Sequence, residues 1–164
     1  MGRFRAVGMW TEVTVVVAQA DGEPGPMTKE DFEALARFRF AVRSYLRFSE
    51  ETVREHGVTP QHYQLLLAIK GVPGREWASV GELAEQLQLR HHSTVELVDR
   101  AQGNGLVERA PDPADGRTVR VVLTGQGQRV LAVLSPLHRD QMRRMAEALT
   151  PPAWGSGDGA QRRP

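Results

Sequence analysis

The sequence contains no cysteine in its 164 residues. This excludes disulfide bonds, thiolate metal sites and cysteine-based peroxide sensing. It also has no apolar run near the ~20 residues that a membrane-spanning helix needs. The apolar run Val13 to Ala18 is shorter than the hydrophobic region of a usual secretory signal. We therefore expect a cytoplasmic protein with no membrane partner.

An excess of charge of one sign is missing as well. Lysine and arginine number 21 against 20 aspartate and glutamate residues, so the net charge is +1. A protein held on nucleic acid by bulk charge would be more basic, so composition by itself does not indicate a DNA partner. Hydrophobic residues at 40% and charged residues at 25% are ordinary for a globular chain, and the length predicts one domain.

Residues 79–124 predict two short helices joined by a tight turn. Ser79 is a good N-cap, and Glu82 three residues later completes a capping box. Apolar residues recur at helical spacing behind them. After the turn at 88–90, a second helix is expected from about His91 to Gln102, where Gly and Asn residues that tolerate a left-handed conformation end it.

A hairpin is predicted directly after these helices. Residues 106–109 form its first strand, and residues 118–123 alternate and are rich in β-branched side chains, which favours a second strand. Residues 111–117 lie between them as a turn with a basic end. Two helices and a hairpin in this order are typical of a winged helix-turn-helix, in which the second helix enters the major groove of DNA and the hairpin reaches an adjacent groove.

Several short motifs in this stretch resemble the MarR family of bacterial transcriptional regulators. They are Val98-Asp99-Arg100, Gly105-Leu106-Val107, Asp115 with Arg117, Leu123-Thr124 and Gly127. Their order and spacing carry the resemblance, which extends from about residue 31 to about residue 149. It implies a mainly α fold with a small β-wing, and a homodimeric DNA-binding regulator, expected to be a repressor, on a pseudo-palindromic duplex.

The resemblance also divides the chain. Residues 28–149 are expected to form the MarR-like domain, with residues 58–124 as its DNA-binding unit. Residues 28–57 and 125–149 would supply the dimerisation helices, because a first helix of ~40 Å is poorly covered by a chain of this size. Residues 1–27 are interpreted as a mobile extension or, alternatively, as a strand that docks on the body or on a partner.

Local signals predict the remaining helix boundaries. Thr28 is an N-cap with Asp31 in the first turn, and Thr59-Pro60 opens the next helix. Thr124 caps the helix after the wing, and Ser135-Pro136 is expected to break and restart it, because an interior proline loses a hydrogen bond. The Pro- and Gly-rich residues 150–164 predict a disordered tail, which bears on the strength of the dimer.

Polar side chains on the second helix are the ones expected to reach DNA. Serine, threonine and histidine hydrogen-bond to base edges or phosphates, and arginine reads guanine or grips phosphate. The candidates are Arg90, His91, His92, Ser93, Thr94, Glu96 and Arg100. The alternative is an ordinary solvated helix face. Asp99 is expected to be structural and to pair with an arginine.

Arg117 stands at the basic end of the predicted hairpin tip. A tip that offers one arginine can insert it into a narrow minor groove, where the potential is most negative. By resemblance, Asp115 orients this arginine rather than contacting DNA. The alternative is a local surface ion pair worth under ~1 kcal/mol.

The resemblance further implies a small aromatic or phenolic effector between the dimerisation helices and the DNA-binding unit. The candidates to line such a crevice are Phe40, Arg43, Arg47, Phe48, His62 and Tyr63. The same residues also fit ordinary core and flank positions. An effector would shift the population towards a dimer whose recognition helices no longer match the half-site spacing.

Signs of catalysis or of a bound cofactor are lacking. His91 and His92 point ~100° apart on a helix and chelate poorly, and Asp112 and Asp115 lack the spacing of a calcium loop. The sequence contains no phosphate loop, nucleophile elbow or paired catalytic carboxylates. We therefore predict no enzyme, metal or cofactor. The remaining alternatives are a winged-helix protein-interaction module without sequence-specific DNA binding and a metal-dependent sensor.

Overall fold

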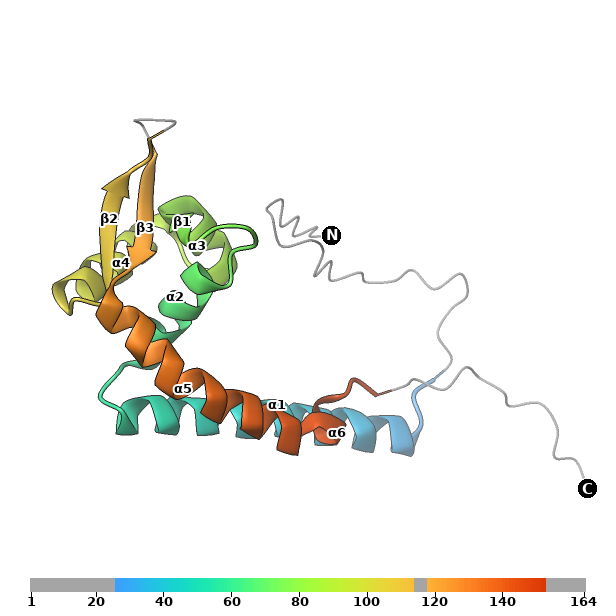
Figure 1. Ribbon diagram of the computed structural model, residues 1–164. Coiled ribbons are helices and arrows are strands. Elements are labelled where there is room, and N and C mark those ends of the chain that lie inside the picture. The colour runs from blue at the N-terminus through green and yellow to red at the C-terminus, as the bar shows by residue number, and fades with distance from the viewer. Residues whose placement is uncertain (1–25, 114–117, 153–164) are drawn as a thin grey trace, which may run out of the picture.

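The computed structural model describes residues 26–113 and 118–152, which form a helical arm and a compact unit with a small sheet (Figure 1). The unit contains α2, α3, α4 and the three strands, while α1, α5 and α6 form the arm. The elements in chain order are α1 (Lys29–Glu55), α2 (Pro60–Lys70), β1 (Trp77–Ser79), α3 (Val80–Leu87), α4 (His91–Gly103), β2 (Val107–Pro111), β3 (Val119–Leu123), α5 (Gly125–Arg144) and α6 (Ala146–Leu149).

Side-chain caps fix where four of these helices begin, as the sequence predicted. Thr28 accepts a hydrogen bond from the backbone N–H of Asp31 and forms a capping box with it. Ser79 forms the same box at α3. Thr59 and Thr124 each accept from a backbone N–H of the first turn of α2 and α5. These hydroxyls satisfy N–H groups that a helix start otherwise leaves unpaired.

The sheet has three antiparallel strands in the order β1-β3-β2. Two strands were predicted, and β1 was missed because three residues are too few to show alternation. The hairpin register pairs Val107 with Leu123 and Pro111 with Val119. The first strand therefore begins one residue later than predicted and extends to Pro111. On the other side of β3, Trp77 pairs with Val122 and Ser79 with Arg120.

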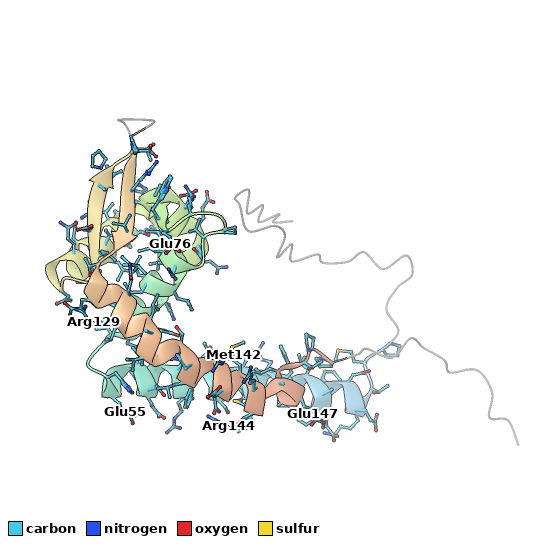
Figure 2. The ribbon with its side chains drawn as sticks, in the orientation of Figure 1. Glu55, Glu76, Arg129, Met142, Arg144 and Glu147 are labelled. Atoms are coloured by element: carbon cyan, nitrogen blue, oxygen red, sulfur yellow. The ribbon has the colours of Figure 1, made fainter. Side chains whose placement is uncertain are left out.

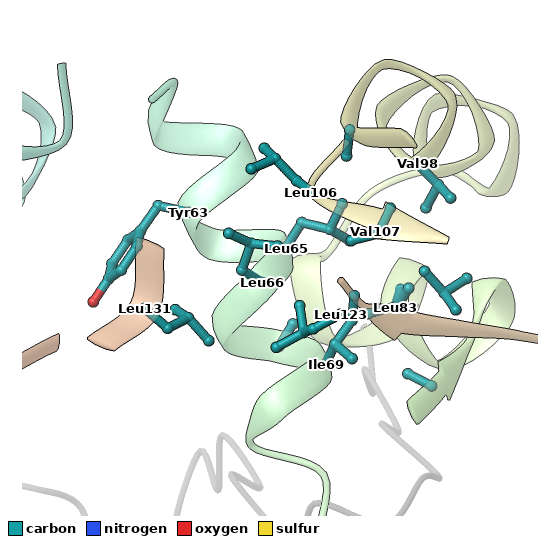
Figure 3. Close-up of a cluster of buried hydrophobic side chains, with 14 of the residues drawn as sticks. Tyr63, Leu65, Leu66, Ile69, Leu83, Val98, Leu106, Val107, Leu123 and Leu131 are labelled. Atoms are coloured by element: carbon teal, nitrogen blue, oxygen red, sulfur yellow. The ribbon is translucent and has the colours of Figure 1, made fainter. Parts of the chain in front are cut away.

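The core lies around α2, whose Leu65, Leu66 and Ile69 are fully buried. Side chains from α3, α4, both hairpin strands and α5 close around this helix (Figure 3). Burying a leucine or isoleucine side chain is worth about 1.5–3 kcal/mol relative to leaving it exposed. The same cluster that stabilises the fold therefore also fixes α4 and the hairpin relative to one another.

A compact junction joins the hairpin to α5 and explains the motif formed by Leu123-Thr124 and Gly127. The Thr124 hydroxyl donates to the Gly105 carbonyl at 2.6 Å, and its backbone N–H donates to the Leu106 carbonyl at 3.1 Å. Gly105 has φ +67°, a conformation that side chains rarely adopt. A Cβ on Gly127 would lie 2.2 Å from the Leu106 carbonyl oxygen. The motif thus allows the start of α5 to touch the entry of β2.

The predicted break at Ser135-Pro136 is wrong, because α5 continues through Pro136 to Arg144. Leu134 and His138 are buried on either side of the proline, and the His138 Nδ1 donates to the Leu134 carbonyl at 2.8 Å. Packing of these side chains against α1 and α2 outweighs the ~3 kcal/mol that an interior proline costs a helix. The helix then ends near Met145, before the short α6.

Helix α1 is 27 residues long and exposes several of its large apolar side chains. Ala41 and Val53 are buried, whereas Phe32 is 55% and Leu46 49% exposed. Neither this helix nor any other in the described part of the chain combines the length and hydropathy of a membrane span.

Candidate nucleic-acid interface

The tight turn between α3 and α4 sets the direction of the second helix. Gln88 ends α3 in the left-handed conformation with φ 54°. The Leu89 backbone N–H returns to the Ala84 carbonyl at 2.9 Å, which closes the last turn of α3. Arg90 is then extended as the N-cap of α4. The chain therefore turns from α3 into α4 over three residues, as the sequence predicted.

The first turns of α4 bring most of the predicted contact residues together on the surface. Arg90, His91, His92 and Glu96 are exposed, and Ser93 is half-buried. Among the described residues, no side chain caps the N-terminus of α4. Its first backbone N–H groups are therefore open, and such groups favour a phosphate or another anion.

Thr94 does not belong to this surface, so its predicted role in DNA contact is wrong. It is fully buried, and its hydroxyl donates to the Arg90 carbonyl at 3.1 Å. Thr94 precedes Leu97, Val98 and Ala101 on the face of α4 that packs into the core. A threonine tolerates this position because the bond to the preceding turn satisfies its hydroxyl.

Arg100 is exposed but lies at the far end of α4, about 14 Å along the axis from His91. Burial lowers the pKa of His62 on α2, and the positive charge of Arg100 lowers it further. Arg100 is thus close enough to α2 to influence His62, whereas the other candidates lie in the first two turns of α4. The structure therefore separates it from the other candidates on this helix.

Asp99 joins α4 to the hairpin, as expected for a structural carboxylate. It pairs with Arg109 of β2 at 2.8 Å, and the same arginine donates to the Gln102 side chain at 3.0 Å. Two residues one turn apart on α4 are thus held by one residue of β2. The pair orients the hairpin against the helix even though exposed pairs contribute little stability.

The hairpin projects away from the arm, beside α4 (Figure 1). The Asp112 backbone N–H donates to the Thr118 carbonyl at 3.0 Å, which closes the base of the loop. Asp115 and Arg117, the predicted tip residues, lie outside the described residues. The structure thus defines where the hairpin loop begins and ends.

A cluster near the loop end of β3 was not predicted to have a role. The guanidinium groups of Arg75 and Arg120 both lie over the Trp77 ring. Glu82 accepts from Arg75. Burial would raise the pKa of Glu82, but hydrogen bonds from Ser79 and Arg75 outweigh it, and the net pKa is lowered. Strand β1 places these groups on one face of the sheet, and recognising it would have revealed them.

The structure does not gather the six residues predicted for the effector crevice around one pocket. Phe40 is 67% exposed, Arg43 and Arg47 are on the surface, and His62 is buried elsewhere on α2. Phe48 packs edge-on against His138. A pocket of about 440 Å³ lies instead where α1, α2 and α5 meet and is lined by Tyr45, Tyr63, Leu67, Ser135, His138, Arg139, Met142, Arg143 and Ala146. Tyr63 is the predicted residue that it contains.

Metal-ligand chemistry finds no support in the described part of the chain. No group of three or more histidine, cysteine, aspartate or glutamate residues there is arranged to hold an ion. The adjacent His91 and His92 stand apart from a third ligand in this set, which leaves them as surface polar groups.

Helix-turn-helix, flanking hairpin and long helical arm together define a winged helix-turn-helix protein. A MarR family model matches residues 56–118. The uncharacterized HTH-type transcriptional regulator YsmB of Bacillus subtilis is 29% identical over 134 residues, which cover 76% of this chain and 86% of YsmB. The transcriptional regulator HosA of Escherichia coli is 33% identical over 94 residues, covering 55% of this chain and 67% of HosA.

A solved structure agrees with these relatives. Sco3205, a MarR family transcriptional regulator from Streptomyces coelicolor determined in complex with DNA, superimposes with a TM-score of 0.62 at 27% identity, covering 80% of this chain and 82% of that one. The chain belongs to the MarR family. It is therefore a transcriptional regulator and not an enzyme, and the predicted fold class is confirmed.

Proposed function

We propose that this regulator acts in the cytoplasm as a homodimer that binds a pseudo-palindromic DNA duplex and represses nearby transcription. The observation that carries the proposal is the polar, uncapped first turn of α4 beside a projecting hairpin. That arrangement suits a helix in the major groove and a wing in the next groove. The DNA complex of the related Sco3205 supports the same partner.

The residues of α4 divide into two roles in this proposal. Arg90, His91 and His92 lie at the start of the helix, where side chains reach base edges and open N–H groups meet phosphate. Ser93 and Glu96 lie within the next turn. Arg117 would enter the minor groove, with Asp115 orienting it. Arg100 has at most a phosphate contact from the far end of α4.

The arm supports a homodimer because it exposes large apolar side chains. Phe32, Phe40 and Leu46 on α1 are between 49% and 67% exposed, and Val133 and Met142 on α5 are 54% and 50% exposed. Apolar surface of this kind is stabilised when a second copy covers it. In a dimer, the two copies of α4 would then read half-sites about one DNA turn apart.

The pocket at the junction of the arm and the DNA-binding unit suits a small aromatic effector. Its wall is mainly apolar, and Arg139, Arg143, Ser135 and the two tyrosines add polar groups to it. His138 stacks on Tyr63 with ring centroids 4.5 Å apart, so an aromatic face is already accommodated there. Effector binding would release DNA by favouring a dimer with a different spacing of α4.

Selection of random duplex DNA by the purified protein tests this function. We expect an inverted repeat to be enriched. Arg117→Ala should weaken binding of that repeat by at least about tenfold, because one minor-groove arginine is lost. Arg37→Gln, which removes the same charge from the arm, is the matched control and should leave affinity nearly unchanged. Light scattering on the same samples reports the dimer.

The outcomes separate the alternatives. Enrichment by a dimer, lost in Arg117→Ala, supports a sequence reader with its wing in a groove. An intact dimer that enriches no sequence, and whose affinity for DNA does not fall steeply with salt, would contradict the proposal. That result would favour a protein-interaction module, because phosphate-driven DNA binding falls steeply with salt. A monomer that enriches nothing would contradict the dimer.

A further inference from the structure

Trp77 lies between the start of the helix-turn-helix and Arg120, near the loop end of β3. The Arg75 guanidinium carbon is 3.9 Å from the centre of its ring and that of Arg120 is 4.3 Å from it. Trp77 pairs with Val122 in the sheet and Arg120 pairs with Ser79, so Trp77 and Arg120 are diagonal neighbours on one face. Both contacts fall within the ~6 Å range of a cation–π interaction.

Each arginine also pairs with a carboxylate in another part of the DNA-binding unit. Arg75 donates to Glu82, whose carboxylate also accepts from Ser79 and caps α3. Arg120 pairs at 2.9 Å with Asp112, whose side chain is only 8% exposed. A continuous series of contacts thus runs from the first turn of α3, through the indole ring, to the residue that follows β2.

This series ends at the base of the hairpin loop. Asp112 donates its backbone N–H to the Thr118 carbonyl, so the residue held by Arg120 is also the one that closes the loop. Each guanidinium is restrained on two sides, by a carboxylate and by the ring. Removing the ring would leave Arg120 held, among the described residues, by Asp112 alone. The side-chain link from the hairpin loop to α3 would then be broken, while the backbone pairing of β1 with β3 would remain.

We propose that Trp77 is a positioning residue for DNA binding, which holds the base of the wing in a fixed orientation relative to the helix-turn-helix through its contacts with Arg75 and Arg120. The inference rests on the proposed function, because the wing must meet one groove while α4 occupies another. Trp77 acts without touching DNA itself. Pre-organisation of this kind raises affinity by removing the cost of ordering the wing on binding.

Amide hydrogen exchange of the free protein tests the positioning directly. In Trp77→Leu, which keeps an apolar side chain but removes the ring, exchange at the Asp112 amide should accelerate about tenfold or more. Exchange in α2 should stay unchanged, which also shows that the variant folds. Trp77→Phe, the matched control, keeps an aromatic face and should retain most of the protection. Equal exchange at Asp112 in the wild type and Trp77→Leu would overturn the inference.

Operator binding then tests the consequence. Trp77→Leu should weaken binding about tenfold, and Trp77→Phe much less. If Trp77 acts through the wing, its effect should shrink in the Arg117→Ala background, because residues that act through one element are not additive. Fully additive losses would refute positioning and indicate a general loss of structure.

Different results would refute the proposed function and the proposed role of Trp77. A wild type that binds no duplex, together with accelerated Asp112 exchange in Trp77→Leu, would refute the proposed function while leaving the restraint on the wing intact. A wild type that binds its operator, together with unchanged affinity in Trp77→Leu, would refute the role of Trp77 alone.

Discussion

Replacing Gly127 with alanine probes the junction on which the hairpin and α5 depend. A Cβ at this position would lie 2.2 Å from the Leu106 carbonyl oxygen, 3.2 Å from the Leu106 carbonyl carbon and 3.3 Å from the Leu66 Cδ2. Ordinary contacts begin at 3.4 Å. The first clash is with backbone, which cannot rotate away as a side chain does. The start of α5 must therefore move off β2 to admit the methyl group.

Two opposing effects determine how much Gly127→Ala changes the free energy of unfolding. Alanine gains up to about 1 kcal/mol over glycine in a helix, because glycine loses more freedom on folding. Overpacking costs about 1–3 kcal/mol and sometimes more, and a carbonyl at 2.2 Å belongs at the severe end. Displacement also strains the bond from the Thr124 N–H to the Leu106 carbonyl. We expect Gly127→Ala to lower the free energy of unfolding by about 2 kcal/mol.

Urea unfolding followed by circular dichroism measures this difference, with Gly125→Ala as the control. Gly125 lies in the same turn of α5, and the nearest atom to its Cβ is the flexible end of Arg129 at 3.5 Å. The control should be neutral or slightly stabilising. For a chain of this length, a loss of about 2 kcal/mol lowers Tm by about 4–8 °C. Equal stability of the two variants would refute the argument from close approach.

Three further perturbations have definite expected outcomes. Gln88→Gly should raise the free energy of unfolding by about 0.5–1 kcal/mol in urea, because it relieves a left-handed φ of 54°. Burial lowers the pKa of His62, so the unfolded state binds more protons than the folded state below about pH 6.5, and the free energy of unfolding should decrease there. Urea unfolding at about pH 5.5 and pH 7.5 should show a smaller decrease in His62→Gln than in the wild type. Asp99→Asn should cost under about 1 kcal/mol in thermal unfolding, because the Asp99 side chain is exposed in its pair with Arg109.

The parts of the fold that the sequence predicted are those with a local cause. Caps at Thr28, Thr59, Ser79 and Thr124 depend on hydrogen bonds within the next three residues, and the structure has each of them. The turn after α3 is equally local. Alternation in 118–123 was enough to find β3, because β-branched residues in a period of two favour a half-buried strand.

Which residues of α4 are buried was harder to predict from the local sequence pattern. Thr94 was assigned to the surface because threonine is polar, yet it lies on the buried stripe with Leu97 and Val98. A hydroxyl that bonds the preceding turn carries no cost in the core, so polarity alone gave the wrong face. The same limit applies to Pro136, where packing on distant helices outweighed a local helix breaker.

Contacts between segments far apart in the sequence were the hardest to predict. The pocket draws Tyr45 from α1, Tyr63 from α2 and His138 from α5, so its position depends on how three helices cross. The residues predicted for the crevice come from α1 and α2 but not from α5, and they were chosen by residue type; Phe40 lies on the surface. The contacts of Trp77 likewise required β1, which brings residues 43 positions apart onto one face.

Helix α5 connects the two sites on which the proposed regulation depends. Its first turn touches the entry of β2 through Gly127, and farther along it carries His138 into the pocket (Figure 2 shows the helix with its side chains). The His138 Nδ1 donates to a carbonyl, so in the neutral ring the Nε2 accepts from the Ser49 hydroxyl of α1 at 2.9 Å. One face of the same ring stacks on Tyr63 of α2.

Packed helices shift as units rather than deform, so a ligand that displaces α5 at the pocket must also move it against Leu106 or against α2. Both contacts belong to the unit that positions α4 and the wing. Any coupling between effector and DNA that uses this helix is reciprocal in binding free energy. The factor by which effector weakens operator binding should therefore equal the factor by which operator weakens effector binding, and unequal factors would mean that effector and operator do not compete through two states of this one protein.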